Sequence, residues 1–496
     1  MLSKSQPGKL QRRPERNDRA LGRFEDPNKT QGSRPGKPQV IVWPWKTRKW
    51  PDIKAKMADE IHSIADMDSR IVALGTIMHS GIGRLRTRQI MDAINMYYND
   101  DQYAKGRVPQ DIFLSQILPQ MQKLVLLGPK TFKRTEVYIP APGMSANIVL
   151  NRVQVATILS CMWFNLFQYN YVSKGPVGIR DLSIPSITHI FTEQNIFALQ
   201  CIINYFARVN EYMTDPDEDI RNTFSAGNII VKRSVLTATP DWPSSTKPIC
   251  QIALGEERLD DAPTKMCIVN AHEYIGGDCM FKGILSQEEV ILLTRPECLV
   301  ATLICAGLND NETITIIGAE KISQYIGYGS SIRFDGNYID TAPKGYNKEC
   351  TEVITQTAMI FMDASRRTAR VSQFIDDFER DLNKAYCGFS SLKFSKAGEY
   401  LAGGNWTYAF NGANMQIKFI QQVLAASEAD KSLVYYPNGR DFEAIVMPFI
   451  DWLMRAELTV GELFKLYVEM LQEIRGAKNI RMSDIDVFNY ISEIYE

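Results

Sequence analysis

One stretch of the sequence restricts the possible folds more than any other. A short apolar run at residues 266–269 leads to the paired glycines Gly276 and Gly277, and then to Glu288 and Glu289 at the start of an apolar helical run. Glycines tolerate positive φ and let backbone N–H groups approach a phosphate closely. In open α/β sheets, ligands bind at the carboxyl ends of the strands. The pattern predicts a strand that ends at an anion site, with acid–base groups a few residues further on.

Each part of this pattern also has an ordinary explanation. A glycine pair after a strand is most often a simple turn. Adjacent glutamates are most often an exposed helix start that the helix dipole stabilises. Taken alone, the stretch leaves both interpretations open.

The charge distribution separates a tail from the rest of the chain. The 496 residues are 45% apolar and 23% charged, which allows two to four globular domains, but residues 1–50 hold 13 Lys and Arg against 4 Asp and Glu. We therefore expect residues 1–48 to form a disordered basic tail. Such a tail could contact nucleic acid, another polyanion or a membrane surface, could act as a nuclear import signal, or could only keep the chain in solution.

Cysteine and histidine usage indicates the compartment and argues against a metal. Nine cysteines occur without a C-x-x-C pair, and four histidines occur without i, i+4 spacing. This usage favours an intracellular, reducing environment and no histidine zinc site. The longest apolar run, residues 153–167, is broken by polar residues, so we expect a buried helix and no membrane span.

Periodicity divides the chain into a helical portion and an α/β portion. Apolar residues at three- and four-residue spacing predict an all-helical accessory region over residues 49–213, including a helix over residues 151–167 that Ser145 caps. Short apolar runs in residues 214–496 predict strands separated by helices. The helices expected in the first region lie at residues 57–67, 87–98, 111–127, 151–167 and 190–212, and the strands expected in the second lie at residues 228–231, 250–254, 266–269, 313–317 and 432–436.

The order of these elements predicts an α/β fold with a mixed sheet flanked by helices. The runs at residues 266–269 and 313–317 are separated by helical segments, which implies parallel strands buried on both faces. Residues 352–362 fit a strand or a buried helix equally well. Late helices are expected at residues 368–385, 415–427 and 458–473.

The spacing of several strings in order resembles the poly(ADP-ribose) glycohydrolase family over residues 110–475. The family's signature has three glycines followed by Gln-Glu-Glu. This chain looks similar, with Gly276, Gly277 and a third residue, Asp278, then eight residues and Gln287-Glu288-Glu289. The further matching strings are Arg295-Pro296-Glu297-Cys298-Leu299, Gly318-Ala319-Glu320, Tyr325-Ile326-Gly327-Tyr328, Lys384-Ala385-Tyr386-Cys387-Gly388-Phe389 and Gly404-Asn405-Trp406.

This resemblance implies a macro-domain-like fold and a hydrolase that cuts the ribose–ribose O-glycosidic bond of poly(ADP-ribose), in the nucleus or cytoplasm, with no cofactor or metal. It implies that Glu289 is general acid and then base, and that Glu288 holds a ribose hydroxyl. Two enclosed carboxylates repel, so that one can keep a proton near neutral pH. The substrate-binding residues that it implies are Gly276 and Gly277 at the diphosphate, Gln287, Tyr328 against the ligand, and Asn405 and Phe410 at the far wall.

The chain departs from the family's pattern at positions that would face the ligand. Val269 replaces an aspartate, His272 an asparagine, and Asp278 the third glycine, while Asn438 stands where an aromatic residue closes over the ligand. A carboxylate about 5 Å from a diphosphate charge costs roughly 3 kcal/mol at an effective dielectric constant near 20.

Three interpretations follow from these departures. In the first, the chain is a divergent glycohydrolase that acts on poly(ADP-ribose), including the polymer on poly(ADP-ribosyl)ated proteins. In the second, it is a pseudoenzyme that reads ADP-ribose or binds other proteins. In the third, it is a structural protein unrelated to ADP-ribose. The persistence of Glu288, Glu289 and Tyr328 favours the first.

Overall fold

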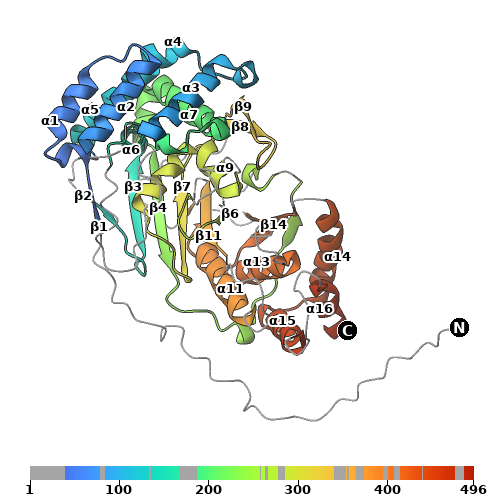
Figure 1. Ribbon diagram of the computed structural model, residues 1–496. Coiled ribbons are helices and arrows are strands. Elements are labelled where there is room, and N and C mark those ends of the chain that lie inside the picture. Colours follow the sequence, from blue (N-terminus) through green and yellow to red (C-terminus); the bar gives the residue numbers. More distant parts are fainter. Residues whose placement is uncertain are drawn as a thin grey trace, which may run out of the picture.

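A central eight-stranded mixed sheet organises the molecule, with helices on both faces (Figure 1). The computed structural model describes residues 39–78, 84–132, 136–167, 187–256, 258–262, 266–276, 285–339, 353–354, 357–364, 374–394, 400–406, 414–437, 440–474 and 485–495. The strands of this sheet, in spatial order, are β3 (Ala146–Asn151), β4 (Asn228–Val235), β7 (Glu312–Ile317), β11 (Ala358–Asp363), β6 (Met266–Ala271), β13 (Tyr400–Gly404), β14 (Ser432–Tyr436) and β5 (Ile252–Leu254). The predicted α/β class with a mixed sheet is confirmed.

The direction of two strands differs from the prediction. We expected the strands at residues 266–269 and 313–317 to be parallel, but β11 lies between them, parallel to β6 and antiparallel to β7. β6 and β7 therefore run in opposite directions. The same pairing shows that the ambiguous segment at residues 352–362 contains a strand and not a buried helix. All six residues of β11 are buried.

Alternate side chains of the central strands enter two separate hydrophobic cores. In β6, Cys267 and Val269 pack on one face of the sheet, whereas Met266 and Ile268 pack on the other. Because both faces are covered by helices, the strand reads as a continuous apolar run.

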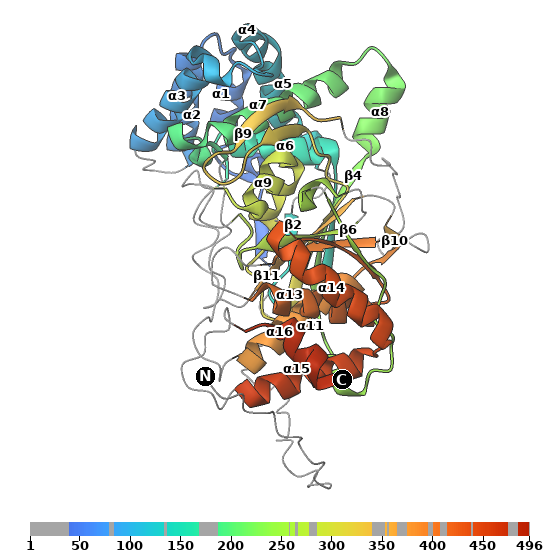
Figure 2. The same cartoon turned by 90° about the vertical axis from the view of Figure 1, so that its right-hand side faces the viewer.

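The helices divide between the two cores. On the first face lie α1 (Trp50–Ala58), α2 (Ile64–Met78), α3 (Arg84–Asn99), α4 (Gln110–Ile112), a π-helical turn (Phe113–Ile117), α5 (Leu118–Thr131), α6 (Arg152–Trp163), α7 (Ile196–Thr214), α8 (Glu218–Ala226), α9 (Gln287–Thr294) and α10 (Ala301–Ile304). On the second lie α11 (Phe374–Ser390), α13 (Met415–Glu428), α14 (Arg440–Ala456), α15 (Val460–Ile474) and α16 (Val487–Tyr495). The first helices and the last lie at opposite ends of the molecule in both views (Figures 1 and 2). In the part of the chain described here, no helix has the length and apolar character needed to cross a membrane.

The expected helical region at residues 49–213 contains strands as well, so the all-helical prediction is wrong in detail. β2 (Glu136–Ile139) pairs with β1 (Gln39–Val42), and β3 forms one edge of the large sheet. Ser145 does not cap the following helix; its Oγ accepts the N–H of Val235, 3.1 Å away. The cap is Asn151, which forms a capping box with Gln154.

The predicted tail also ends earlier than expected. Residues 39–48 belong to the fold, because β1 is paired and the side chain of Trp43 is completely buried. Trp43 stacks on Trp45 with ring centroids 5.2 Å apart and packs on Phe132 at 4.3 Å. This aromatic cluster anchors the chain where the tail was expected to continue. Residues 1–38 lie outside the described residues.

A buried ion pair joins the helical region to the α/β region. Arg152, at the start of α6, donates to both carboxylate oxygens of Glu297 at 2.6 Å and to the carbonyl of Gly318 at 2.9 Å. Glu320 lies 3.7 Å from the same guanidinium. From α7, Asn204 donates to the carbonyl of Ile322 at 3.2 Å. The Arg152 bonds fix the helical region to the segments around Glu297 and Gly318, and Asn204 fixes it to the start of the hairpin of β8 (Ser323–Ile326) and β9 (Arg333–Asn337).

Candidate functional site

The candidate site lies where β6, β11 and β13 end at the same edge of the sheet. These three strands are parallel, and Asp363 at the end of β11 is paired with Ala271 at the end of β6. The chain then turns through residues 272–276, which we call the strand-end loop, and returns to the same edge at α9. This is the edge at which parallel strands of α/β proteins hold ligands.

Gln287, the first residue of α9, is bonded to the backbone of β6. Its Oε1 accepts the N–H of Asn270 at 3.0 Å, and its Nε2 donates to the carbonyl of Ile268 at 3.2 Å. The side-chain amide thus makes the hydrogen bonds to β6 that a neighbouring strand would otherwise make there. Its predicted role toward substrate stays a prediction, but its structural role is to fix the helix start beside β6.

Glu288 is 2% exposed, and both of its carboxylate oxygens are used by the strand-end loop. Oε2 accepts the N–H of His272 and Oε1 accepts the N–H of Gly276, both at 2.8 Å. Gly276 has a φ of 101°, which a side chain would strain. The positive φ expected for the first glycine is therefore present, and it aims a backbone donor at a carboxylate.

Glu289 is equally buried and is held by Ser286, the N-cap of α9. Its Oε2 accepts the N–H of Ser286 at 2.9 Å and also the Ser286 hydroxyl, as part of a capping box. The capping box restricts the rotamer of Glu289. The two adjacent glutamates are thus not an exposed helix start, which was the ordinary explanation of the motif.

The electrostatics of the site favour a retained proton. Burial, and then the Glu289 carboxylate, raise the pKa of Glu288 well above its ordinary value, while its two N–H donors oppose this. Burial likewise raises the pKa of Glu289, against the Ser286 bonds. Two neighbouring buried carboxyls with raised pKa values are suited to general acid–base chemistry.

Tyr328 lies in the turn between β8 and β9. An isolated bridge between Leu285 and Gly329 holds this turn against the start of α9. Burial, and then the Glu289 carboxylate, raise the pKa of Tyr328 to about 12, although 54% of the residue's surface is exposed. The phenol is therefore within electrostatic reach of Glu289, while its packing against a ligand stays a prediction.

The other residues singled out in the sequence fall into three groups: one lies at the same edge of the sheet, one is buried in the first core, and the rest lie outside the described residues. Asn405 follows β13 at the same edge, where its Oδ1 accepts the hydroxyl of Tyr435 at 2.7 Å. Val269 is completely buried in the first core, opposite Phe361 of β11. Gly277, Asp278, Phe410 and Asn438 lie outside the described residues.

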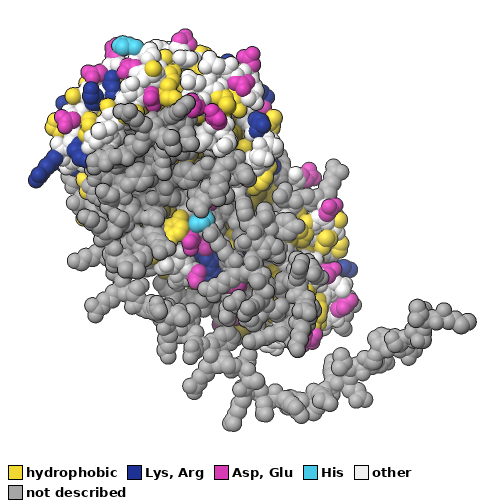
Figure 3. Space-filling view, in the orientation of Figure 1, with side chains coloured by type: hydrophobic (Ala, Val, Ile, Leu, Met, Phe, Trp, Pro, Cys, Tyr) yellow, Lys and Arg dark blue, Asp and Glu magenta, His cyan; other side chains and the backbone are white. Residues whose placement is uncertain are grey.

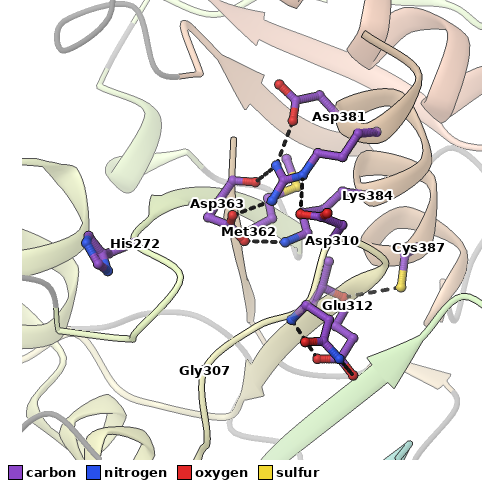
Figure 4. Close-up of polar contacts among 12 residues, drawn as sticks. His272, Gly307, Asp310, Glu312, Met362, Asp363, Asp381, Lys384 and Cys387 are labelled. Carbon is purple, nitrogen blue, oxygen red and sulfur yellow. Dashed lines mark hydrogen bonds and ion pairs between the residues drawn. The ribbon is translucent and has the colours of Figure 1, made fainter. Parts of the chain in front are cut away.

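One group beside the site was not predicted. Asp363 forms ion pairs with Lys384 and Arg380 of α11, and Arg380 also bonds Asp381 at 2.7 Å (Figure 4). Asp363 is one of the charges that raise the pKa of Glu288. Asp363 could have been predicted as a site residue, because it follows an apolar run in the sequence. It was not predicted, because that run fitted a strand and a helix equally well.

Charged side chains of both signs lie beside the site, where Lys384 and Arg380 are paired with Asp363. In the space-filling view, a histidine and acidic side chains lie close together near the middle of the face (Figure 3). Among the described residues, no three His, Cys, Asp or Glu side chains lie close enough together to hold a metal ion.

Comparison with known proteins identifies similar families for both regions. The model of the helical domain of poly(ADP-ribose) glycohydrolase matches residues 107–225, and the model of its macro domain fold matches residues 239–443. The matched ranges include the strand-end loop, α9 and the β8–β9 hairpin.

Individual relatives agree with this match. The chain is 23% identical over 429 residues to "Probable poly(ADP-ribose) glycohydrolase 2" of Arabidopsis thaliana, covering 73% of this chain and 78% of the relative. It is 29% identical over 348 residues to "Poly(ADP-ribose) glycohydrolase 1" of the same plant, covering 67% of this chain and 53% of the relative. With "Poly(ADP-ribose) glycohydrolase 1" of Caenorhabditis elegans it shares 29% identity over 209 residues, which are 40% of this chain and 26% of the relative.

Proposed function

The chain belongs to the poly(ADP-ribose) glycohydrolase family, and from this premise we propose that it hydrolyses the ribose–ribose O-glycosidic bonds of poly(ADP-ribose) and releases ADP-ribose. The observation that carries the proposal is the pair Glu288 and Glu289, both 2% exposed and both with a raised pKa, at the carboxyl edge of the sheet. A pair of exposed glutamates would not support it.

In this proposal Glu289 moves the proton. Its raised pKa keeps a proton on the carboxyl to a higher pH than in an exposed glutamate, and Glu289 gives this proton to the leaving ribose oxygen as the glycosidic bond breaks. The resulting carboxylate then takes a proton from the attacking water. Negative charge beside the ribose ring also stabilises an oxocarbenium-like transition state. Ser286 restricts the rotamer of Glu289 and so keeps the carboxyl in one place through both steps.

Glu288 has a different role in this mechanism. Because its two oxygens accept the N–H groups of His272 and Gly276, its first effect is to shape the strand-end loop. The loop begins the segment that would bind the diphosphate through backbone N–H groups. A carboxylate with both oxygens occupied is a poor proton donor, which assigns the acid role to Glu289. Tyr328 would pack against the bound nucleotide, near the same carboxyl.

The test is release of ADP-ribose from poly(ADP-ribose) by the full chain and by Glu289→Gln. We expect release by the unaltered chain and at least a thousandfold loss in Glu289→Gln. Glu443→Gln, an exposed residue of α14, is the matched control and should release ADP-ribose normally. Calorimetric measurement of ADP-ribose binding separates the alternatives. If the unaltered chain binds ADP-ribose but does not release it from the polymer, the chain is a reader. If it shows no binding and no release, it is a structural protein.

The basic N-terminal segment suggests a second contact with the polymer. We propose that the excess of Lys and Arg in residues 1–50 binds poly(ADP-ribose) or nucleic acid through its phosphates, in the nucleus or cytoplasm. Removal of residues 1–38 should reduce the salt dependence of polymer binding and leave ADP-ribose binding unchanged. Equal salt dependence of the two proteins would refute this contact.

A further inference from the structure

A buried ion pair holds the segment that follows α10. Arg233 of β4 and Glu312 of β7 are 2% and 0% exposed and form an ion pair. The guanidinium donates to the carbonyls of Ala306 at 2.8 Å and Gly307 at 2.7 Å. The Glu312 carboxylate accepts the N–H of Asn309 at 2.9 Å. Residues 306–309 are thus fastened to the sheet at both ends.

This fastened segment is the support on which the strand-end loop rests. The N–H of Leu308 donates to the carbonyl of Glu273 at 2.8 Å. One residue earlier, the bare backbone of Gly307 lies against the ring of Tyr274, so closely that an added Cβ would stand 2.7 Å from Tyr274 Cε1. Tyr274 in turn donates its N–H to Nδ1 of His272 at 3.1 Å. Figure 4 shows Gly307 and His272 on neighbouring segments, with Glu312 beside Gly307.

The other side of the loop faces Glu288. His272 and Gly276, which flank Tyr274, both direct their N–H groups at the Glu288 carboxylate at 2.8 Å. The loop is therefore held between a catalytic-site carboxylate on one side and the Gly307 segment on the other. Its position depends on how closely the Tyr274 ring can approach residue 307.

We propose that Gly307 is a positioning residue for the strand-end loop. Its lack of a side chain lets the Tyr274 ring lie against the backbone, and this contact keeps the N–H groups of His272 and Gly276 directed at Glu288. Gly307 has no positive φ that would itself require glycine, since it is absent from the described residues with such backbone angles. The requirement for glycine there comes from the space that Tyr274 occupies. The consequence for catalysis rests on the proposed function, but the consequence for the loop does not.

The first experiment compares amide hydrogen exchange in Gly307→Ala with the unaltered chain. A Cβ closer than 3.0 Å to another heavy atom forces a shift, so the Tyr274 ring must move, and under the proposal the loop moves with it. We expect the amides of His272 and Gly276 to exchange at least tenfold faster, with other segments unchanged. Gly388→Ala is the matched control, because its Cβ would meet Ile360 Cγ2, also at 2.7 Å, in the second core away from the loop. Equal exchange of the loop in Gly307→Ala and the unaltered chain would overturn the proposal.

A double-mutant cycle with Tyr274→Ala identifies the contact. If residue 307 acts through the Tyr274 ring, Tyr274→Ala alone should speed loop exchange, and adding Gly307→Ala should change it less than twofold further. Additive effects would overturn the proposal. Tyr274→Ala also provides the result if Gly307→Ala fails to fold.

Kinetics distinguish this inference from the proposed function. In an active chain, Gly307→Ala should raise KM for poly(ADP-ribose) at least fivefold and lower kcat less, while Gly388→Ala should change neither. An unaltered chain that releases no ADP-ribose would refute the proposed function and leave the exchange result to decide the role of Gly307. An active chain with normal loop exchange in Gly307→Ala would refute only the role of Gly307.

Discussion

The carboxylate of Glu288 accepts the backbone N–H of Gly276 at 2.8 Å, so one member of the buried glutamate pair is bonded directly to the first glycine of the strand-end loop. The second oxygen of the same carboxylate accepts the N–H of His272. Changes to the loop and changes to the carboxyl pair should therefore affect each other.

Glutamine substitutions should distinguish the two glutamates. At Glu288 an amide would place an NH₂ group against one of two N–H donors, so Glu288→Gln should lower the free energy of unfolding by about 1–3 kcal/mol at pH 5. Glu289→Gln keeps an oxygen for the Ser286 N–H and should change it little. Urea denaturation measures both, and equal losses would show that the N–H bonds to Glu288 do not matter.

The stability of the chain should also fall as pH rises. Burial raises the pKa of Glu289 above the ordinary 4.5, so its protonated form favours folding, fully below that pH, and this contribution is lost as pH rises through the folded pKa. Glu289→Gln cannot ionise. Its stability relative to the unaltered chain should increase as pH rises above the ordinary 4.5, and a constant difference would contradict the raised pKa.

Gln287→Ala should destabilise the join between β6 and α9. The substitution removes the acceptor of the Asn270 N–H and the donor to the Ile268 carbonyl. It should lower the free energy of unfolding by about 1–3 kcal/mol. Gln287→Glu keeps the acceptor for the Asn270 N–H but turns an oxygen toward the Ile268 carbonyl, so it should not restore the full stability. Thermal unfolding in the absence of ligand tests this, because a residue that only binds substrate would leave the melting temperature unchanged.

Tyr328 should contribute through its ring. Tyr328→Ala should weaken ADP-ribose binding by about 1–3 kcal/mol, the usual contribution of a base stacked on an aromatic side chain. Tyr328→Phe keeps the ring and should retain most of the affinity. Calorimetry measures both variants, and an equal loss would mean that the hydroxyl, not the ring, contacts the ligand.

Removing the charge of Asp278 should favour the diphosphate. This prediction rests on sequence, since Asp278 lies outside the described residues. A carboxylate at the third glycine position repels a diphosphate, so Asp278→Gly should tighten ADP-ribose binding several-fold. An unchanged dissociation constant would mean that Asp278 points away from the ligand.

Local patterns predicted the elements that have one clear period. The strand at residues 432–436 matches β14, and the helix at residues 415–427 matches α13 to within one residue. β3 was missed, because an edge strand is half-exposed and its short run was absorbed into the helix that follows. β11 stayed ambiguous, because a run buried on both faces has no period that separates strand from helix.

The part of the site that follows from local sequence order was predicted, and the part that depends on distant segments was not. The order of strand, glycines and carboxyl pair is local, and the structure brings Gly276, Glu288, Glu289 and Tyr328 together. The contribution of Asp363 could not be predicted, since it depends on β11 entering the sheet beside β6 from about ninety residues further along the chain.

The sequence by itself determined the family, the mixed α/β class and the two carboxyl groups at the start of a helix after a glycine loop. Only the tertiary structure decided what each carboxyl does: Glu288 receives the N–H groups of the loop, and Glu289 is held by its own helix cap. It also decided that Gly307 supports the loop from the opposite side. Hydrogen bonding and the cost of burying a charge depend on distances through space, and residues far apart in the chain set those distances.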